Sequence, residues 1–226
     1  MGNNFSSYFL KPEHRRSTKC YIAVNSHLKE ALLDVVHDEQ YGIKRDPEEL
    51  YKFFNRKENV EKINKLEEKR VLSQDQIDLL YQQNQRTFSD KWDITLICIL
   101  IINFTSLKPP TTGWKKQPAA TDTSTGAFVV RARRMRNLFN HSTLTSFAEE
   151  NDFRAFFDET RDLVVGLNYK DIAEFDKLDN DAIDQTLIKT DIDLFMDTFK
   201  TSKEKRMIIS MAVSYTHLTL PTIYSV

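Results

Sequence analysis

The sequence predicts an all-α fold, a helical bundle with further helices before and after it. Glycine and proline are scarce, with 5 and 6 residues among 226, which disfavours a β-rich fold because such folds need many tight turns. Apolar residues recur at the spacing of a helix face, and several segments begin with helix-capping residues. No stretch alternates polar and apolar residues for long enough to predict a strand.

Three helices are expected in the N-terminal part of the chain. The first covers residues 21–40, where apolar side chains recur every three or four positions. The second begins at Asp46, an N-cap followed by a proline and two acids, and runs to Leu66 with a break near Asn55. Ser73 begins a capping box and opens the third, a short helix.

A very apolar helix is expected between Ser89 and the proline pair at 109–110. Ser89 and Asp90 favour a helix start, and the residue before a proline avoids helical geometry. The apolar run at 94–104 is about half as long as a membrane span, so it predicts a buried helix. The loop that follows contains Trp114 and is long for a helical bundle, which makes it a candidate functional segment.

The last part of the chain is also expected to be helical. One helix is predicted to begin at Asp122 or Thr123. Ser146 begins a second capping box, whose helix is expected to end at Gly166 as its C-cap. Residues 172–199 are acidic and amphipathic, which predicts a further helix.

The expected catalytic residues lie near the end of the helix that follows Thr123, and they are Arg136, Asn137 and His141. Arginine stabilises charge on phosphate oxygens, histidine transfers protons near neutral pH, and an amide orients either group. RNA carries a 2′-hydroxyl beside each phosphate, and attack by this hydroxyl cleaves the strand without a metal. The neighbouring side chains that are expected to contact nucleic acid are Arg131, Arg133 and Arg134.

The spacing of Arg136 and His141 leaves two interpretations open. At about 100° per residue, the two side chains diverge by about 140° on one straight helix. A joint site then requires Arg136 to lean over, the helix to end near Asn140, or a second copy of the motif from a dimer partner. In the other interpretation the arginines form a solvated helix face, and His141 closes the helix by bonding a carbonyl group.

The ordered motifs between residues 92 and 141 resemble the HEPN domain of the DAZ-interacting zinc-finger protein type. These motifs are Trp92-Asp93-Ile94-Thr95-Leu96, Pro110-Thr111-Thr112-Gly113-Trp114, Asp122-Thr123-Ser124, Arg136-Asn137 and His141. The resemblance covers roughly residues 20–167, with looser similarity to about residue 200, and implies a helical bundle, often dimeric. It also implies that the three expected catalytic residues form an Arg-x(4–6)-His motif, which in catalytic members cleaves RNA without metal in a site shared across a dimer.

Four positions depart from the pattern of that family. They are Lys115 in place of an aspartate, Gln117 in place of an apolar residue, Gly126 in place of a helix former and Asn140 in place of a glycine. These changes concern loop geometry more than the fold. Relatives usually join this domain to RING, nucleotide-binding or death-type modules, and the sequence shows none of these, so ubiquitin-ligase chemistry is not expected.

The bulk properties limit the function further. The net charge is −1 and the isoelectric point about 6.5, so any RNA contact is expected to be local rather than spread over a basic surface. Cys20 and Cys98 do not form a Cys-x-x-Cys pair and are expected to be reduced thiols of a cytoplasmic protein. No metal site and no cofactor are expected.

The predicted domain organisation has a flexible N-terminus at 1–19, a HEPN-like domain at 20–167 and an acidic amphipathic helical extension at 168–212. Residues 213–226 resemble a translated sequencing adapter, an artefact that is excluded from the fold prediction. The natural protein is therefore expected to continue beyond this piece. Near the start, Gly2 fits the pattern for N-myristoylation.

Two functions remain open. The first is a HEPN-like module for protein interaction and dimerisation that also binds RNA, located in the N-terminal part of a longer signalling or ubiquitin-pathway protein of innate immunity. The alternative is a metal-independent endoribonuclease that uses the Arg-x4-His motif. The expected partners are a second copy of the chain, single-stranded RNA and further proteins, with membrane contact only if Gly2 is acylated.

Overall fold

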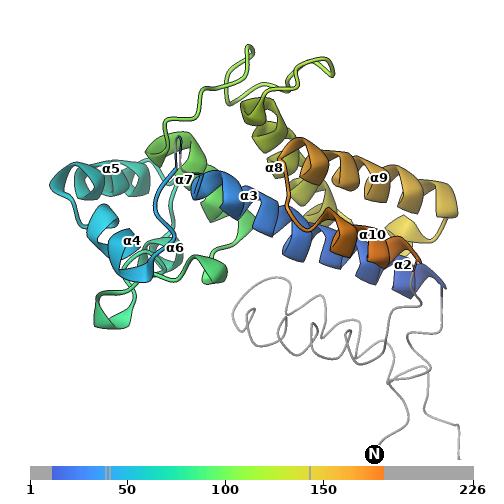
Figure 1. The fold of residues 1–226 in the computed structure, drawn as a ribbon, viewed down its shortest axis with the longest axis horizontal. Coiled ribbons are helices and arrows are strands. Elements are labelled where there is room, and N and C mark those ends of the chain that lie inside the picture. Colours follow the sequence, from blue (N-terminus) through green and yellow to red (C-terminus); the bar gives the residue numbers. More distant parts are fainter. Residues whose placement is uncertain (1–11, 39, 41, 143, 181–226) are drawn as a thin grey trace, which may run out of the picture. The chain divides into compact units, whose positions relative to one another are not determined.

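The computed structural model describes residues 12–38, 40, 42–142 and 144–180. These residues form helices joined by loops and turns, with no strand among them (Figure 1). This confirms the predicted all-α fold. Gly2, the part of the acidic extension beyond residue 180 and the tail at 213–226 lie outside the described residues.

The first helical stretch is continuous but changes its winding. It consists of α2 (Pro12–Ile22), the π-helical turn η1 (Ala23–Leu28) and α3 (Lys29–Val36). Residues 12–19, which were assigned to a flexible N-terminus, are therefore helical. The stretch ends at Val36 rather than at residue 40, because the chain turns back there and the Ile43 amide donates to the Val36 carbonyl at 2.7 Å.

Three short helices follow, namely α4 (Pro47–Phe54), α5 (Lys57–Glu68) and α6 (Gln74–Asp78). The Asp46 carboxylate accepts from the first two free amides of α4 at 3.0 and 2.9 Å, so the predicted N-cap is confirmed. Asn55 ends α4 at the predicted break. Ser73 forms the predicted capping box at the start of α6. These signals were correct because each acts within three residues of its own helix end.

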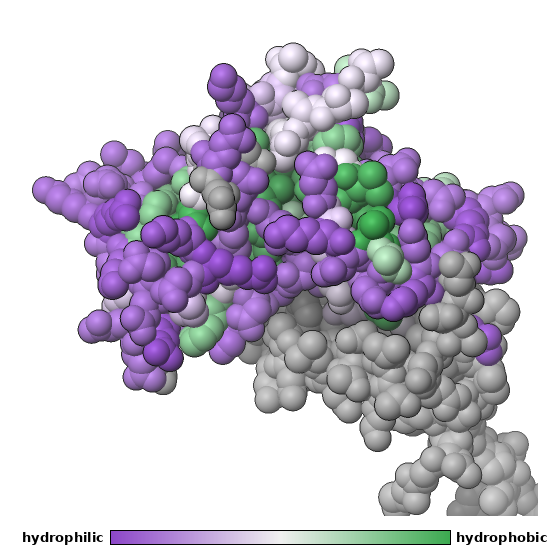
Figure 2. Space-filling model, in the orientation of Figure 1, coloured by the Kyte–Doolittle hydropathy of each residue, from purple (hydrophilic) through white to green (hydrophobic). Residues whose placement is uncertain are grey.

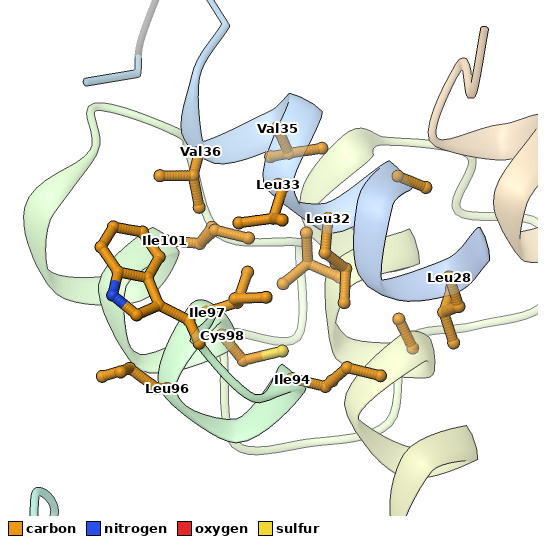
Figure 3. Packing of buried hydrophobic residues seen from close by; sticks show 14 of the residues in the cluster. Leu28, Leu32, Leu33, Val35, Val36, Ile94, Leu96, Ile97, Cys98 and Ile101 are labelled. Carbon is orange, nitrogen blue, oxygen red and sulfur yellow. The ribbon is translucent and has the colours of Figure 1, made fainter. Parts of the chain in front are cut away.

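The apolar helix α7 (Ile94–Phe104) lies at the centre of the core, and two 3-10 turns, η2 (Gln83–Gln85) and η3 (Ser89–Lys91), precede it. The predicted start at Ser89 is wrong, because Asp93 caps α7 by accepting from the Leu96 amide at 2.7 Å. Among the described residues, no helix is long and apolar enough to cross a membrane. The buried residues labelled in Figure 3 come from η1, α3 and α7, and they are Leu28, Leu32, Leu33, Val35, Val36, Ile94, Leu96, Ile97, Cys98 and Ile101.

The remaining elements are α8 (Thr125–His141), the 3-10 turn η4 (Leu144–Phe147), α9 (Glu150–Gly166) and α10 (Ile172–Asn180). Ser124 caps α8 by accepting from the Ala127 amide at 3.2 Å, so neither Asp122 nor Thr123 is the N-cap. The capping box predicted at Ser146 is also wrong. Ser146 lies in η4, and α9 begins after Glu149, whose side chain makes no cap hydrogen bond.

Gly166 has a different role from the predicted C-cap. It is the last residue of α9, and a Cβ atom there would lie 2.3 Å from the Phe128 ring on α8. After the end of α9, the chain adopts left-handed backbone at Asn168, with φ 58°, and not at Gly166. The glycine therefore allows α8 and α9 to approach each other closely.

The helices α8 and α9 pack against each other and against η1, and α8 also packs against α7 (Figure 1). Phe175 attaches α10 to this group, because its fully buried ring lies 5.0 Å from that of Phe157 and 5.4 Å from that of His27. The face shown in Figure 2 is mostly hydrophilic, with apolar residues gathered in small patches. α8 is thus supported on its core side by three elements.

Candidate functional site on helix α8

The start of α8 is fixed by a network around Asp122. One carboxylate oxygen of Asp122 accepts from the amide and the hydroxyl of Ser124 at 3.0 and 2.7 Å. The other accepts from the amide and hydroxyl of Thr111 at 3.4 and 3.3 Å. The hydrogen bonds from Ser124, followed by those from Thr111, lower the pKa of the Asp122 carboxyl group. Asp122 therefore ties the long loop to the residue that caps α8.

Two of the predicted nucleic-acid-binding arginines hold this same loop. The Arg131 guanidinium donates through Nη2 to the carbonyls of Ala119 and Asp122 at 2.5 and 2.7 Å and, more weakly, of Ala120 at 3.4 Å. Arg133 donates through Nη2 to the Trp114 carbonyl at 3.5 Å. Arg131 thus fixes the loop through three backbone acceptors.

The loop also explains one departure from the family pattern. A Cβ atom at Gly126 would lie 2.5 Å from the Lys108 carbonyl oxygen and 3.2 Å from the Pro110 ring. These are backbone and ring atoms, which cannot move aside as a flexible side chain can. Gly126 is therefore required by the close approach of the loop and not by the helix.

Arg136 has three neighbours in the described residues. Its Nη2 lies 3.6 Å from an Asp93 carboxylate oxygen, and its Nη1 lies 3.5 Å from the side-chain oxygen of Asn137. When the Asn140 amide is oriented with its oxygen toward Arg136, this oxygen lies over the guanidinium face, 2.9 Å from Nη1 and 3.1 Å from Nη2 and Nε. Arg136 is consequently half-buried and faces α7.

The last turns of α8 present a different surface. Arg134, Asn137 and His141 are exposed, and Leu138 is one of the few exposed large apolar side chains of the described residues, at 46 % exposure. His141 is the last residue of α8, and Ser142 ends the helix. This end of α8 therefore offers cationic, amide and imidazole groups together with one apolar side chain.

The structure brings some of the predicted site residues onto one side of α8. Arg133, Asn137 and His141 follow at intervals of four residues, and Arg136 and Asn140 lie beside them at the same interval. Arg136 and His141 remain separated by about 140° around the helix, with Arg136 on the side of α7. Within one chain, the motif arginine and histidine do not form a single site.

The described residues hold no group of three or more histidine, cysteine or acidic side chains that could bind a metal ion. Burial raises the pKa of the Cys98 thiol to about 12 and raises that of Cys20 further. Neither thiol is a nucleophile at neutral pH, because the thiolate is the reactive form.

Two residues of this site were missed from the sequence. Asn140 lies four residues after Arg136, a spacing at which helical side chains meet, so the pair could have been found. Asp93 caps another helix, α7, and its contact with Arg136 had no signal in the sequence beyond its position in the Trp-Asp motif.

Comparison with known protein families identifies the family of the chain. The sequence model of the DZIP3/hRUL138-like HEPN family matches residues 47–190, which is more than half of the chain and includes α4 to α10. This range begins and ends later than the predicted domain at 20–167. No curated protein and no solved structure matches the chain. From its helices, its ordered motifs and this match, the chain belongs to the DZIP3/hRUL138-like HEPN family.

Proposed function

We propose that this chain is a HEPN module that self-associates through α8 and contacts the phosphates of single-stranded RNA with the exposed end of that helix. The observation that carries the proposal is the surface made by Arg134, Asn137, Leu138 and His141. It combines groups that bind phosphate with an apolar side chain that favours association.

The charge of α8 supports RNA contact. Its 17 residues include four arginines and one histidine but no acid, although the whole chain has a net charge of −1. Arg134 is exposed and makes no hydrogen bond or ion pair to the described residues. Cations on such a surface bind phosphate with an affinity that falls as salt rises.

The positions of the motif residues support self-association. Because Arg136 and His141 diverge on one helix, a twofold pair of α8 helices is the simplest arrangement in which the arginine of one copy approaches the histidine of the other. Leu138 lies between them in sequence and is exposed, so it is placed to pack against its equivalent in such a pair.

Binding of a fluorescein-labelled oligouridylate to the full chain tests the RNA proposal. Arg134→Ala and His141→Ala are expected to weaken binding severalfold and to reduce its salt dependence. Arg86→Ala is the matched control. Arg86 is exposed, lies outside α8 and pairs with the Glu48 carboxylate at 3.0 Å. Equal binding by all three variants and the unchanged chain would remove the RNA proposal.

Light scattering tests the self-association proposal. Leu138→Ser is expected to shift the chain from dimer to monomer. Val165→Ser is the control, because Val165 on α9 is equally exposed at 47 % and lies outside the proposed surface. The proposal is wrong if the chain is monomeric, or if both variants leave the dimer intact.

A metal-independent ribonuclease is the second candidate function, favoured by the presence of an arginine, an amide and an exposed imidazole within one helix end. The 2′-oxygen would lose its proton to a general base and bond to the adjacent phosphorus, and the P–O5′ bond would break with a proton delivered to the leaving 5′-oxygen, giving a 2′,3′-cyclic phosphate and a 5′-hydroxyl. Incubation with RNA in excess EDTA is expected to give this product, and Arg136→Ala or His141→Ala is expected to abolish it. Cleavage that persists in both variants would rule out this chemistry.

A further inference from the structure

We infer that Asp93 and Asn140 hold Arg136 in a closed position, from which only a ligand with paired anionic oxygens, the phosphodiester of RNA, releases it. This inference rests on the proposed function and specifies how the same site chooses its ligand. It makes Asp93 and Asn140 residues that set the availability of the motif arginine.

The contacts of Arg136 define the closed position. With its amide oxygen turned toward Arg136, Asn140 places that oxygen within 3.1 Å of all three guanidinium nitrogens, which is a position over the face of the group, and the Asp93 carboxylate lies 3.6 Å from Nη2. Asp93 therefore offers Arg136 one negative charge, and Asn140 adds a carbonyl dipole on its face. A phosphodiester offers the same charge and two acceptor oxygens at the spacing of the guanidinium fork, whereas a base edge or a hydroxyl carries no charge.

The partial exposure of the Arg136–Asp93 pair indicates that a phosphate can take the place of Asp93. The side chains of Arg136 and Asp93 are 24 % and 41 % exposed, so water reaches both groups and screens their attraction. The 3.6 Å separation is also long for a hydrogen-bonded ion pair. A phosphate can therefore replace Asp93 without leaving a buried charge unpaired.

The surroundings restrict where Arg136 can go. The fully buried Cys98 thiol lies close enough to Arg133 and Arg136 for both guanidinium charges to lower its pKa, against a larger increase caused by burial. The core therefore closes the inner side of Arg136. Release therefore moves the guanidinium outward, toward the solvent to which 24 % of the side chain is already exposed.

Asp93→Asn is the most informative variant. Asparagine caps helices as well as aspartate does, so the hydrogen bond to the Leu96 amide, 2.7 Å in the native chain, can be kept while the charge is removed. The variant is expected to bind labelled oligouridylate about two- to fivefold more tightly, the range set by a partly exposed ion pair. The slope of log affinity against log salt is expected to steepen by about 0.7, as for one added phosphate contact.

Asn140→Ala tests the second holding group and keeps the helix, since alanine is a good helix former. Like Asp93→Asn, it is expected to raise the affinity for labelled oligouridylate. Asp90→Asn is the matched control, because Asp90 is an exposed acid on the neighbouring turn that makes no contact with Arg136. Asp90→Asn is expected to change the affinity less and to leave the salt slope unchanged.

A double-variant comparison identifies Arg136 as the group released. In an Arg136→Ala background, Asp93→Asn is expected to have no more effect than Asp90→Asn. The inference is overturned if Asp93→Asn and Asn140→Ala leave the affinity unchanged or lower it while urea unfolding is native-like. It is also overturned if the gain persists without Arg136. If the unchanged chain does not bind RNA, both the inference and the proposed RNA contact are wrong. If Arg136→Ala binds RNA more weakly but Asp93→Asn does not bind it more tightly, only the inference is wrong.

Discussion

Arg131 and Arg134 stand three residues apart on α8 and have opposite surroundings. Arg131 donates to three carbonyls of the preceding loop, while Arg134 is exposed and makes no such bond within the described residues. The first half of α8 thus holds the preceding loop, and we call it the framework half. The second half exposes side chains to solvent, and we call it the surface half. The number of arginines in a helix therefore does not give the number of cations that are available for binding, because backbone carbonyl groups already accept hydrogen bonds from some of them.

The largest effect is expected at Gly126, in the framework half. Helix propensity alone predicts that Gly126→Ala stabilises the chain by about 1 kcal/mol. Because the new Cβ would lie 2.5 Å from the Lys108 carbonyl oxygen, we expect instead a loss of about 1–3 kcal/mol in the free energy of unfolding. Urea unfolding measures this, and a stabilised variant would show that the loop does not constrain α8.

Arg131→Ala is expected to have the next largest effect on stability. It leaves three loop carbonyls without their charged donor, which costs about 1–2 kcal/mol in the free energy of unfolding. RNA affinity is expected to change little. Arg131→Lys separates charge from geometry, since it keeps a cation with several donors but loses the rigid planar group that positions Nη2 against the three carbonyls, so it should be destabilising, but less so than Arg131→Ala. Native stability in both variants would contradict the framework role.

Acidification is expected to destabilise the fold by protonating His27 in η1 and His37 after α3. His27 lies 3.1 Å from the Tyr169 hydroxyl, and His37 donates to the Ile43 carbonyl at 2.7 Å. Burial lowers the pKa of both histidines below the usual 6.5. The unfolded chain therefore takes up protons at a higher pH than the folded chain. The two neutral histidines make their full contribution to the free energy of unfolding above about pH 6.5. This contribution is lost as the pH falls from there through the lowered pKa values.

Chemical unfolding at several pH values measures this effect. The variant with His27→Gln and His37→Gln is expected to lose stability overall and to depend less on pH between neutrality and the lowered pKa values. An unchanged pH dependence would mean that these two histidines do not couple protonation to folding.

The smallest effect on stability is expected at Arg134, in the surface half. Arg134→Ala removes an exposed side chain without a described partner, so the free energy of unfolding should change by less than about 0.5 kcal/mol. Thermal unfolding checks this value. A loss as large as that of Arg131→Ala would erase the distinction between the two halves of α8.

Local signals in the sequence predicted much of the fold. The caps at Asp46 and Ser73 were correct because the donor and acceptor lie within one turn. The start of α8 was missed by one or two residues because Asp122 bonds to Ser124 and Thr111 instead of to the helix. The capping box at Ser146 failed because the chain forms a 3-10 turn there.

The candidate site was less predictable, because its contacts cross between elements. The bonds of Arg131 to the loop and the approach of Asp93 to Arg136 join residues that no periodicity relates. The predicted roles of Arg136, Asn137 and His141 came from the chemistry of these residue types and from the family resemblance, and they remain predictions, as do the RNA and dimer partners. The structure adds that Arg136 is half-buried beside Asp93 while His141 is exposed.

The most direct test of the division within α8 is the salt dependence of oligouridylate binding by the full chain. The variant with Arg134→Ala and His141→Ala is expected to bind severalfold more weakly, with a shallower slope of log affinity against log salt, because phosphate contacts are lost. Arg131→Lys is expected to keep the slope of the unchanged chain. Equal slopes for all three proteins, or a shallower slope for Arg131→Lys alone, would contradict the claim that the exposed end of α8 is the RNA-binding surface.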